Sequence, residues 1–212
     1  MTNLFNRHKI FWSDKKLIAE VVIGIVLLFL SMYATYWANI YVARRASSSV
    51  TDILLDNIPV VDVDFLYSTG AAIFIIIVAI VAFQDPRRIS FILKSTALFF
   101  LFRSAFMMLT HIGPPQNMLV SNSGDFFHKL SSGDDLFFSA HTGYPFLIAL
   151  IFWNHKRLKD LFFALSIIGA VVVILGHYHY SIDVFSAFFI TFGIFQIAKN
   201  FFKEDYKMLA VT

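Results

Sequence analysis

The 212-residue chain contains no cysteine, and only 15% of its residues are charged. The missing thiol excludes a disulfide framework, a thiolate zinc site and a cysteine nucleophile, so any chemistry rests on histidine, carboxylate, hydroxyl or arginine side chains. Soluble domains carry about 25% charged residues. With 58% hydrophobic residues and a mean hydropathy of +0.71, the composition excludes an ordinary soluble globule and indicates an integral membrane protein.

The apolar residues fall into long blocks separated by short polar connections, without an internal repeat or a low-complexity tract. Length alone would allow a second domain, but these blocks leave no room for another folded unit. We therefore predict an all-α fold, a single polytopic membrane domain.

Six blocks approach the roughly 20 apolar residues that a helix needs to cross about 30 Å of hydrocarbon. The last two are short, and we expect them to extend into the loop between them. The predicted spans are Leu17–Tyr41, Phe65–Phe83, Ile89–Ile112, Leu136–Trp153, Leu161–Leu175 and Asp183–Ala198. The domain boundaries that follow are a cytoplasmic N-terminal segment over 1–16, a six-helix transmembrane catalytic domain over 17–198, and a cytoplasmic tail over 199–212.

Basic residues set the predicted orientation, because cytoplasmic loops retain lysine and arginine. The basic flank of the first block imitates a signal peptide, but the apolar stretch exceeds the roughly 7 to 15 residues of a signal core, so we expect an uncleaved helix. Both termini should be cytoplasmic. Most of the 17 basic residues then share the cytoplasmic side: Arg7, Lys9, Lys15, Lys16, Arg87, Arg88, Lys94, Lys156, Arg157, Lys159, Lys199, Lys203 and Lys207. Because orientation explains the net charge of +3, we expect no nucleic-acid partner.

Four ionisable side chains are predicted at one depth, near the outward ends of three different hairpins. Placing such a group within a membrane span costs about 2.5 to 3.5 kcal/mol on insertion scales, so each is expected to have a functional or structural role. They are Arg103, His141, His179 and Asp183. Their convergence predicts an active site that faces the outer, extracytoplasmic leaflet.

The segment from Gly176 to Asp183 places His179 four residues before a carboxylate. On a helix this spacing puts both side chains on one face, within hydrogen-bonding reach. If the turn is helical, Asp183 can accept the proton on one ring nitrogen and leave the lone pair of the other nitrogen free to attack. The pattern favours a nucleophilic histidine over its alternative, a structural pair that closes an interfacial turn.

Two further residues complete a possible phosphoryl-transfer site. His141, in the sequence Ser139-Ala140-His141-Thr142, could protonate a leaving alkoxide and later deprotonate an acceptor hydroxyl. Arg103 offers a permanent charge and planar donors that match phosphate oxygens. The alternatives are a helix-capping or water-binding role for His141 and an Arg103 that snorkels to outer-leaflet phosphates.

Three segments share a pattern with a known family: Phe138-Ser139-Ala140-His141-Thr142, His179-Tyr180-Ser181-Ile182-Asp183 and the segment from Phe102-Arg103-Ser104 to Gly113-Pro114-Pro115. With these motifs the sequence resembles the sphingomyelin synthase family, a branch of the phosphatidic acid phosphatase type 2 superfamily. The resemblance extends from about Asp56 to Ile197 and includes a faint match at Asp56-Asn57-Ile58-Pro59.

The resemblance implies a six-helix bundle like those of lipid phosphatases and phosphotransferases. In it His179 would attack phosphorus, Asp183 would support the ring and His141 would act as acid and base, through a phosphohistidine and without a metal or other cofactor. The family moves a phospho-headgroup from a glycerophospholipid to a lipid alcohol such as ceramide. Membrane lipids would accordingly be the partners, as phospholipid donor and lipid alcohol acceptor.

Two departures from the family pattern bear on the reaction. Ala140 replaces the usual glycine, and Val172 and Val173 occupy the stretch where the wider superfamily has a Ser-Arg pair. The sequence therefore offers fewer residues to bind the phosphate, which favours a transferase over a monoester phosphatase. We further expect four residues to bind substrate, with Asp135 attracting a cationic choline or ethanolamine group: Arg103, Ser139, Tyr180 and Asp135.

Two other functions fit the same residues. With water as acceptor, the site would make a lipid phosphate phosphatase or a phospholipase C-type hydrolase. A chain that kept the pocket only for binding would be a non-catalytic lipid transporter or scaffold. The sequence does not distinguish which headgroup is moved or which oligomeric state the protein adopts. It also leaves open whether the acceptor is ceramide, diacylglycerol or water.

Overall fold

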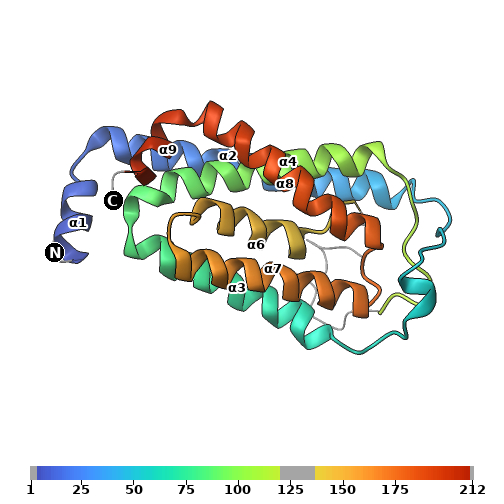
Figure 1. Cartoon of the computed structure of the whole chain (residues 1–212). Helices are drawn as coiled ribbons and strands as arrows, with labels where there is room; N and C mark the ends of the chain where they lie inside the picture. Colours follow the sequence, from blue (N-terminus) through green and yellow to red (C-terminus); the bar gives the residue numbers. More distant parts are fainter. Residues whose placement is uncertain (1–3, 120–136, 211–212) are drawn as a thin grey trace.

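The computed structural model describes residues 4–119 and 137–210, and over these residues every regular element is helical (Figure 1). The prediction of an all-α fold is confirmed. Two short 3-10 turns, η1 (Leu55–Asn57) and η2 (Pro86–Arg88), accompany the α-helices. These are α1 (Leu4–Phe11), α2 (Lys15–Ala43), α3 (Asp64–Gln84), α4 (Ile89–Leu109), α6 (Ala140–Ile151), α7 (Lys156–Leu175), α8 (Ser181–Phe201) and α9 (Lys203–Ala210).

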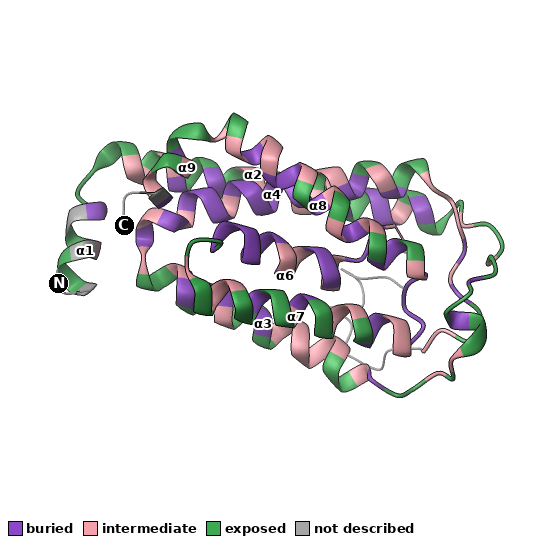
Figure 2. Ribbon diagram, in the orientation of Figure 1, coloured by how far each residue is buried: buried purple, intermediate pink, exposed green. Residues whose placement is uncertain are grey.

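Five of the described helices are long and apolar enough to cross a membrane: α2, α3, α4 together with η2, α7 and α8. Their outer faces expose large apolar side chains, among them Phe29 at 73%, Phe65 at 73% and Phe189 at 78% (Figure 2). An apolar surface of this extent is favourable only against lipid. The arrangement is therefore a membrane helical bundle.

The predicted fourth span, Leu136–Trp153, is longer than the helix that the structure describes in this region, α6. Within the described residues, α6 has 12 residues, about 18 Å at 1.5 Å per residue, well short of the hydrocarbon thickness. It contacts α3, α4, α7 and α8, and Leu147 and Ile148 are fully buried. Non-helical backbone at membrane depth is tolerated where protein surrounds it, so the six predicted full-length spans are not confirmed.

The last two predicted spans are longer in the structure than the sequence suggested. We expected them to extend into the loop between them, but most of the added residues lie at their other ends. Helix α7 starts at Lys156 and still stops at Leu175, while α8 ends at Phe201. Gly176 follows α7, and a Cβ there would lie 2.4 Å from Cε2 of Tyr178. His177 then adopts a positive φ of 53°. This sharp turn keeps the α7–α8 connection short.

Both termini lie at one end of the bundle, together with α1 and α9 (Figure 1). The other end carries the 44–63 and 110–119 connections and the turn over 176–180, and α6 begins on that side. We refer to these as the terminal end and the loop end. This arrangement brings the predicted motifs of α6 and α8 to the same end.

A buried charge cluster holds the terminal end together. Lys94 on α4 is 3% exposed, and its Nζ lies 2.5 Å from Oε2 of Glu20 on α2 and 2.6 Å from Oδ2 of Asp205 on α9. Ser90 donates to the second oxygen of Asp205 at 2.7 Å. The cluster thus joins three helices, and part of the predicted 199–212 tail packs against the bundle.

Candidate active site

The N-termini of α6 and α8 meet at the loop end through one backbone hydrogen bond, from the N–H of Ser139 to the carbonyl of Asp183 at 3.2 Å. Ser139 is fully buried and is the N-cap of α6, where its hydroxyl accepts the N–H of Thr142 at 3.4 Å. Helix N-termini carry partial positive charge and unpaired N–H groups. Two of them in contact favour an anion such as a phosphate.

His179 and Asp183 come together, although not on one helical face. His179 precedes α8 in the turn, and its Nδ1 lies 3.7 Å from Oδ2 of Asp183. This is an ion-pair distance, longer than a hydrogen bond. The assumption of a helical turn was wrong because α8 begins only at Ser181. His179 is 4% exposed and Asp183 2%.

The carboxylate of Asp183 also fixes the turn itself. It accepts the backbone N–H of Tyr180 at 3.0 Å, which is the reciprocal half of a capping box at the start of α8. The same oxygen therefore faces His179 and the chain entering the helix. The carboxylate thus links the position of His179 to the start of α8.

His141 lies in the first turn of α6, and a tyrosine that sequence reasoning missed holds it in place. Its ring stacks on Tyr67 of α3 at 4.1 Å between centroids, and Tyr67 stacks in turn on Tyr178 at 4.0 Å. Nε2 of His141 lies 3.3 Å from the carbonyl of Tyr67. Because a carbonyl can only accept, Nε2 is the donor and Nδ1 is left for proton exchange. His141 is also within electrostatic range of His179 and Arg103.

Helix α7 supports the first turn of α6 by an unusually close approach. A Cβ added to Gly169 would lie 2.2 Å from the carbonyl oxygen of His141. One turn earlier, the hydroxyl of Ser166 donates to the carbonyl of Thr142 at 2.7 Å. The glycine is therefore required for the position of the His141 backbone, a role that spacing alone does not reveal.

Arg103 enters the site from α4 and is 4% exposed. Its Nε donates to the carbonyl of Phe138 at 2.9 Å, and its Nη1 contacts Sδ of Met107 at 3.4 Å. The guanidinium thus fixes the segment that leads into α6. Its contact with substrate phosphate stays a prediction.

Two loop-end connections hold the turn that carries His179. The Tyr180 hydroxyl donates to the carbonyl of Gly113 at 2.9 Å and accepts the N–H of Val50 at 3.1 Å. Asp52, which sequence reasoning also missed, accepts the backbone N–H of Ser181 at 2.7 Å and its hydroxyl at 2.8 Å. Substrate binding by Tyr180 and Ser139 stays a prediction, and Asp135 lies outside the described residues.

The hydrogen bonds to Asp52 keep its carboxylate ionised. Burial by itself would raise the pKa of Asp52, but the bonds from Ser181 and from two backbone N–H groups of its own loop outweigh burial and lower the pKa. A permanent negative charge at the N-terminus of α8 also complements the helix dipole. Asp52 is therefore a second cap for this helix.

An apolar cleft of about 290 Å³ leads from the side of the bundle to His141. It lies between α3, α6 and α7, and among the residues that the structure describes no Asp, Glu, Lys or Arg side chain lines it. Its walls include Gly70, Phe74, His141, Tyr144, Leu165 and Val172. In residues 4–119 and 137–210, no three His, Cys, Asp or Glu side chains gather in a way that would hold a metal.

Comparison with known proteins finds the following similarities. Residues 133–200, which include both histidine motifs, match the sequence model of the family described as PAP2 superfamily C-terminal. The chain is similar to sphingomyelin synthase-related 1 of Caenorhabditis elegans, with 26% identity over 216 residues. The match covers 85% of this chain and 44% of the relative, so the chain spans less than half the length of the relative.

These matches support a likeness to the lipid phosphatases and phosphotransferases of the PAP2 superfamily. The resemblance drawn from the motifs is confirmed: the chain is similar to the PAP2 superfamily over residues 133–200 and to a sphingomyelin synthase-related protein over most of its length. Its long apolar helices also indicate an integral membrane protein.

Proposed function

We propose that the protein is a lipid phosphotransferase that moves a phospho-headgroup from a glycerophospholipid to a lipid alcohol, ceramide or diacylglycerol, through a phosphohistidine at His179. The observation that carries the proposal is the buried pair of His179 and Asp183, 3.7 Å apart, beside the joined N-termini of α6 and α8. The name of the similar worm protein points to the same sphingolipid chemistry.

The first half-reaction breaks the bond between phosphorus and the diacylglycerol oxygen. Nδ1 of His179 is the nitrogen nearest Asp183, so we assign the attack to Nε2 and the retained proton to Nδ1, where the carboxylate stabilises the cationic ring. His141 gives a proton to the leaving alkoxide. The products are diacylglycerol and a phosphohistidine that carries the headgroup.

The second half-reaction is the reverse with a new alcohol. His141, now neutral, takes the proton of the acceptor hydroxyl while its oxygen attacks phosphorus and releases His179. The His141 proton is thereby restored, and no other reactant is required. The two helix N-termini and the charge of Arg103 stabilise the negative charge of the phosphoryl oxygens in both steps.

The position of the site supports an outward-facing reaction. It lies at the loop end, opposite both termini (Figure 1), and the terminal end carries most of the basic residues, which favours a cytoplasmic location for that end. The apolar cleft beside His141 is also lined by Ile73 and Ile168, which are 49% and 53% exposed. A lipid could thus enter laterally with its acyl chain in the cleft and its phosphate at the helix N-termini.

A transfer assay tests the proposal directly. Purified protein in detergent micelles receives headgroup-labelled phosphatidylcholine or phosphatidylethanolamine, with and without ceramide or diacylglycerol. We expect the label to move to the added lipid alcohol. Rapid release of a water-soluble labelled headgroup, at the same rate with and without acceptor, would contradict a transferase and support the hydrolase that the PAP2 match makes the second candidate.

The cleft can be tested by filling it. A Cβ on Gly70 meets no atom within 4 Å, so Gly70→Leu should occupy the cleft without straining the helix. Displacing about two methylenes of an acyl chain costs about 1.6 kcal/mol, so kcat/KM for long-chain donors should fall about tenfold. Short-chain donors, which do not reach the leucine, should be affected much less.

Gly193 on α8 provides the matched control. A Cβ there also meets nothing within 4 Å, and Gly193 does not line the cleft. Gly193→Leu gains the same helix propensity and should leave kcat/KM unchanged for both donors. An equal loss in both variants, or no chain-length dependence in Gly70→Leu, would contradict an acyl chain in the cleft.

A further inference from the structure

The terminal end contains a second cavity, of about 220 Å³, at the opposite end of the bundle from the start of α6 and the turn over 176–180 (Figure 1). It lies between the start of α4, the connection after α6, and helices α8 and α9. Its polar and apolar walls include Arg88, Trp153, His155, Gln196, Lys199 and Tyr206. None of these residues takes part in the proposed reaction.

Arg88 forms the base of this cavity. It is 3% exposed, its Nε donates to Oδ2 of Asp85 at 3.2 Å, and its Nη2 lies 2.5 Å from Nε2 of His155. Because a guanidinium can only donate, Nε2 of His155 accepts. Burial and the charge of Arg88 lower the pKa of His155, so the imidazole is neutral and its ring is held in one orientation.

Lys199 supplies a second cation from the last turn of α8. Its ammonium lies 4.9 Å from the ring centroid of Tyr206 and 5.6 Å from that of Phe195. In the part of the chain that the structure describes, Lys199 forms no ion pair with a carboxylate. Among the described residues, the cavity walls thus present Arg88, which is paired with Asp85, and the cation of Lys199, but no carboxylate of their own.

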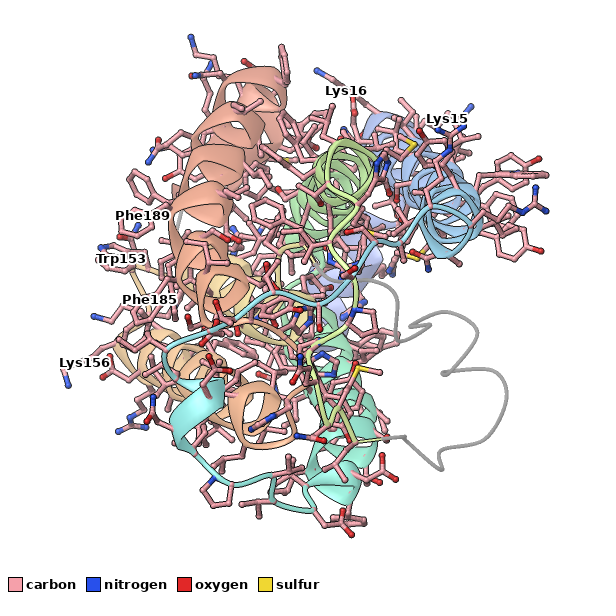
Figure 3. The ribbon with its side chains drawn as sticks, turned by 90° about the vertical axis from the view of Figure 1, so that its right-hand side faces the viewer. Lys15, Lys16, Trp153, Lys156, Phe185 and Phe189 are labelled. Carbon is pink, nitrogen blue, oxygen red and sulfur yellow. The ribbon has the colours of Figure 1, made fainter. Side chains whose placement is uncertain are left out.

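The rim of the cavity faces the surface that contacts lipid. Trp153 is 57% exposed and Phe192 49%, and Figure 3 shows Trp153 on the same outer side of the bundle as Phe185 and Phe189. The ammonium of Lys159 lies 5.0 Å over the Trp153 ring. Tryptophan beside lysine is typical of the membrane–water interface. A ligand of this cavity can therefore keep its chains in the bilayer.

We propose that this cavity binds the phosphate group of an anionic phospholipid from the leaflet at the terminal end. Basic pockets between transmembrane helices bind such headgroups. The bound lipid would bridge α4, α8 and α9, because Arg88, Lys199 and Tyr206 belong to these helices or their junctions. The site is separate from the reaction at His179 and does not depend on it.

Thermal unfolding in mixed micelles tests this site. The probe is phosphatidic acid, added to a His179→Ala background so that turnover cannot consume it, with phosphatidylcholine as the neutral comparison. We expect phosphatidic acid alone to raise the melting temperature. Lys199→Met, which keeps an unbranched chain against the rings, should weaken the apparent affinity about tenfold, the effect of one lost charge-assisted contact.

Three controls decide the result. Lys156→Met removes a lysine whose side chain is 88% exposed at the same end and should leave the affinity unchanged, while Lys199→Arg should restore it. Equal affinity in wild type and Lys199→Met, or an equal response to phosphatidylcholine, would overturn the proposal. So would a stabilisation by inorganic phosphate equal to that by the lipid, because the ligand would then be a soluble anion.

Discussion

Replacing His179 with alanine should abolish the phosphoenzyme and lower turnover at least about 10³-fold, the usual effect of removing a covalent nucleophile. Asp183 cannot substitute, because its carboxylate is occupied by the N–H of Tyr180 at 3.0 Å. The measurement is headgroup transfer in micelles, together with acid-labile labelling of the protein by a phosphorus-labelled donor. The variant should still melt cooperatively.

The neighbouring His177 offers the matched control. It is 4% exposed and lies two residues away in the same turn, with Nδ1 3.5 Å from the carbonyl of Gln116. Since its φ is 53°, asparagine is the replacement that the backbone tolerates. His177→Asn should retain turnover within a few-fold and still form the phosphoenzyme. A labelled protein in His179→Ala, or lost labelling only in His177→Asn, would assign the nucleophile elsewhere.

The His179→Ala variant and the wild type also distinguish an enzyme from the third possible function, that of a lipid transporter or scaffold. A binding protein would show no turnover in the wild type, and His179→Ala would leave its lipid affinity unchanged. An enzyme should lose turnover in the variant while lipid binding in the apolar cleft persists, because His179 does not line that cleft. Measuring both quantities on the same samples distinguishes the two.

Hydropathy predicted the helices that face lipid, because a long apolar run is typical of a helix in contact with the bilayer. Helices α2 and α3 have 29 and 21 residues, close to their predicted blocks. It did not predict the length of α6, since a helix surrounded by other helices is as apolar as one that spans the membrane. Only the contacts of α6 with four neighbouring helices show that it is a central element.

The motif spacing predicted the chemical groups of the candidate site but not the residues that hold them in place. His179 and Asp183 lie together as predicted, yet across a turn rather than along a helix. Their supports come from distant parts of the chain: Asp52 is 129 residues from Ser181, and Tyr67 is 74 residues from His141. No local pattern marks such pairs. An aromatic residue near the outward end of the second block was the only signal for Tyr67.

The candidate site is therefore assembled by packing at the loop end, with contributions from both α4 and α8. Arg103 on α4 and Asp183 on α8 are buried in the site. At the other end, the Lys94 cluster joins α4 to α9, which follows α8 after a single residue. The cluster and the site are consequently linked through the same two helices.

Replacing Lys94 with methionine should lower the free energy of unfolding by about 3 to 5 kcal/mol, because it leaves Asp205 buried without its cation. Asp205 is 4% exposed, so water cannot replace the lost ammonium. For a chain of this size the change corresponds to about 10 °C in melting temperature. Thermal unfolding in detergent, followed by circular dichroism, measures it.

The double variant Lys94→Met with Asp205→Asn tests the cause. The asparagine removes the unpaired charge but can still accept the hydroxyl of Ser90, which lies 2.7 Å from the present carboxylate. We expect it to recover at least half of the lost melting temperature, since the cost is an uncompensated charge rather than lost packing. Lys156→Met, at an exposed position, should have almost no effect. A double variant no more stable than Lys94→Met would show that the lysine acts through packing, for instance against the ring of Phe202 at 5.6 Å.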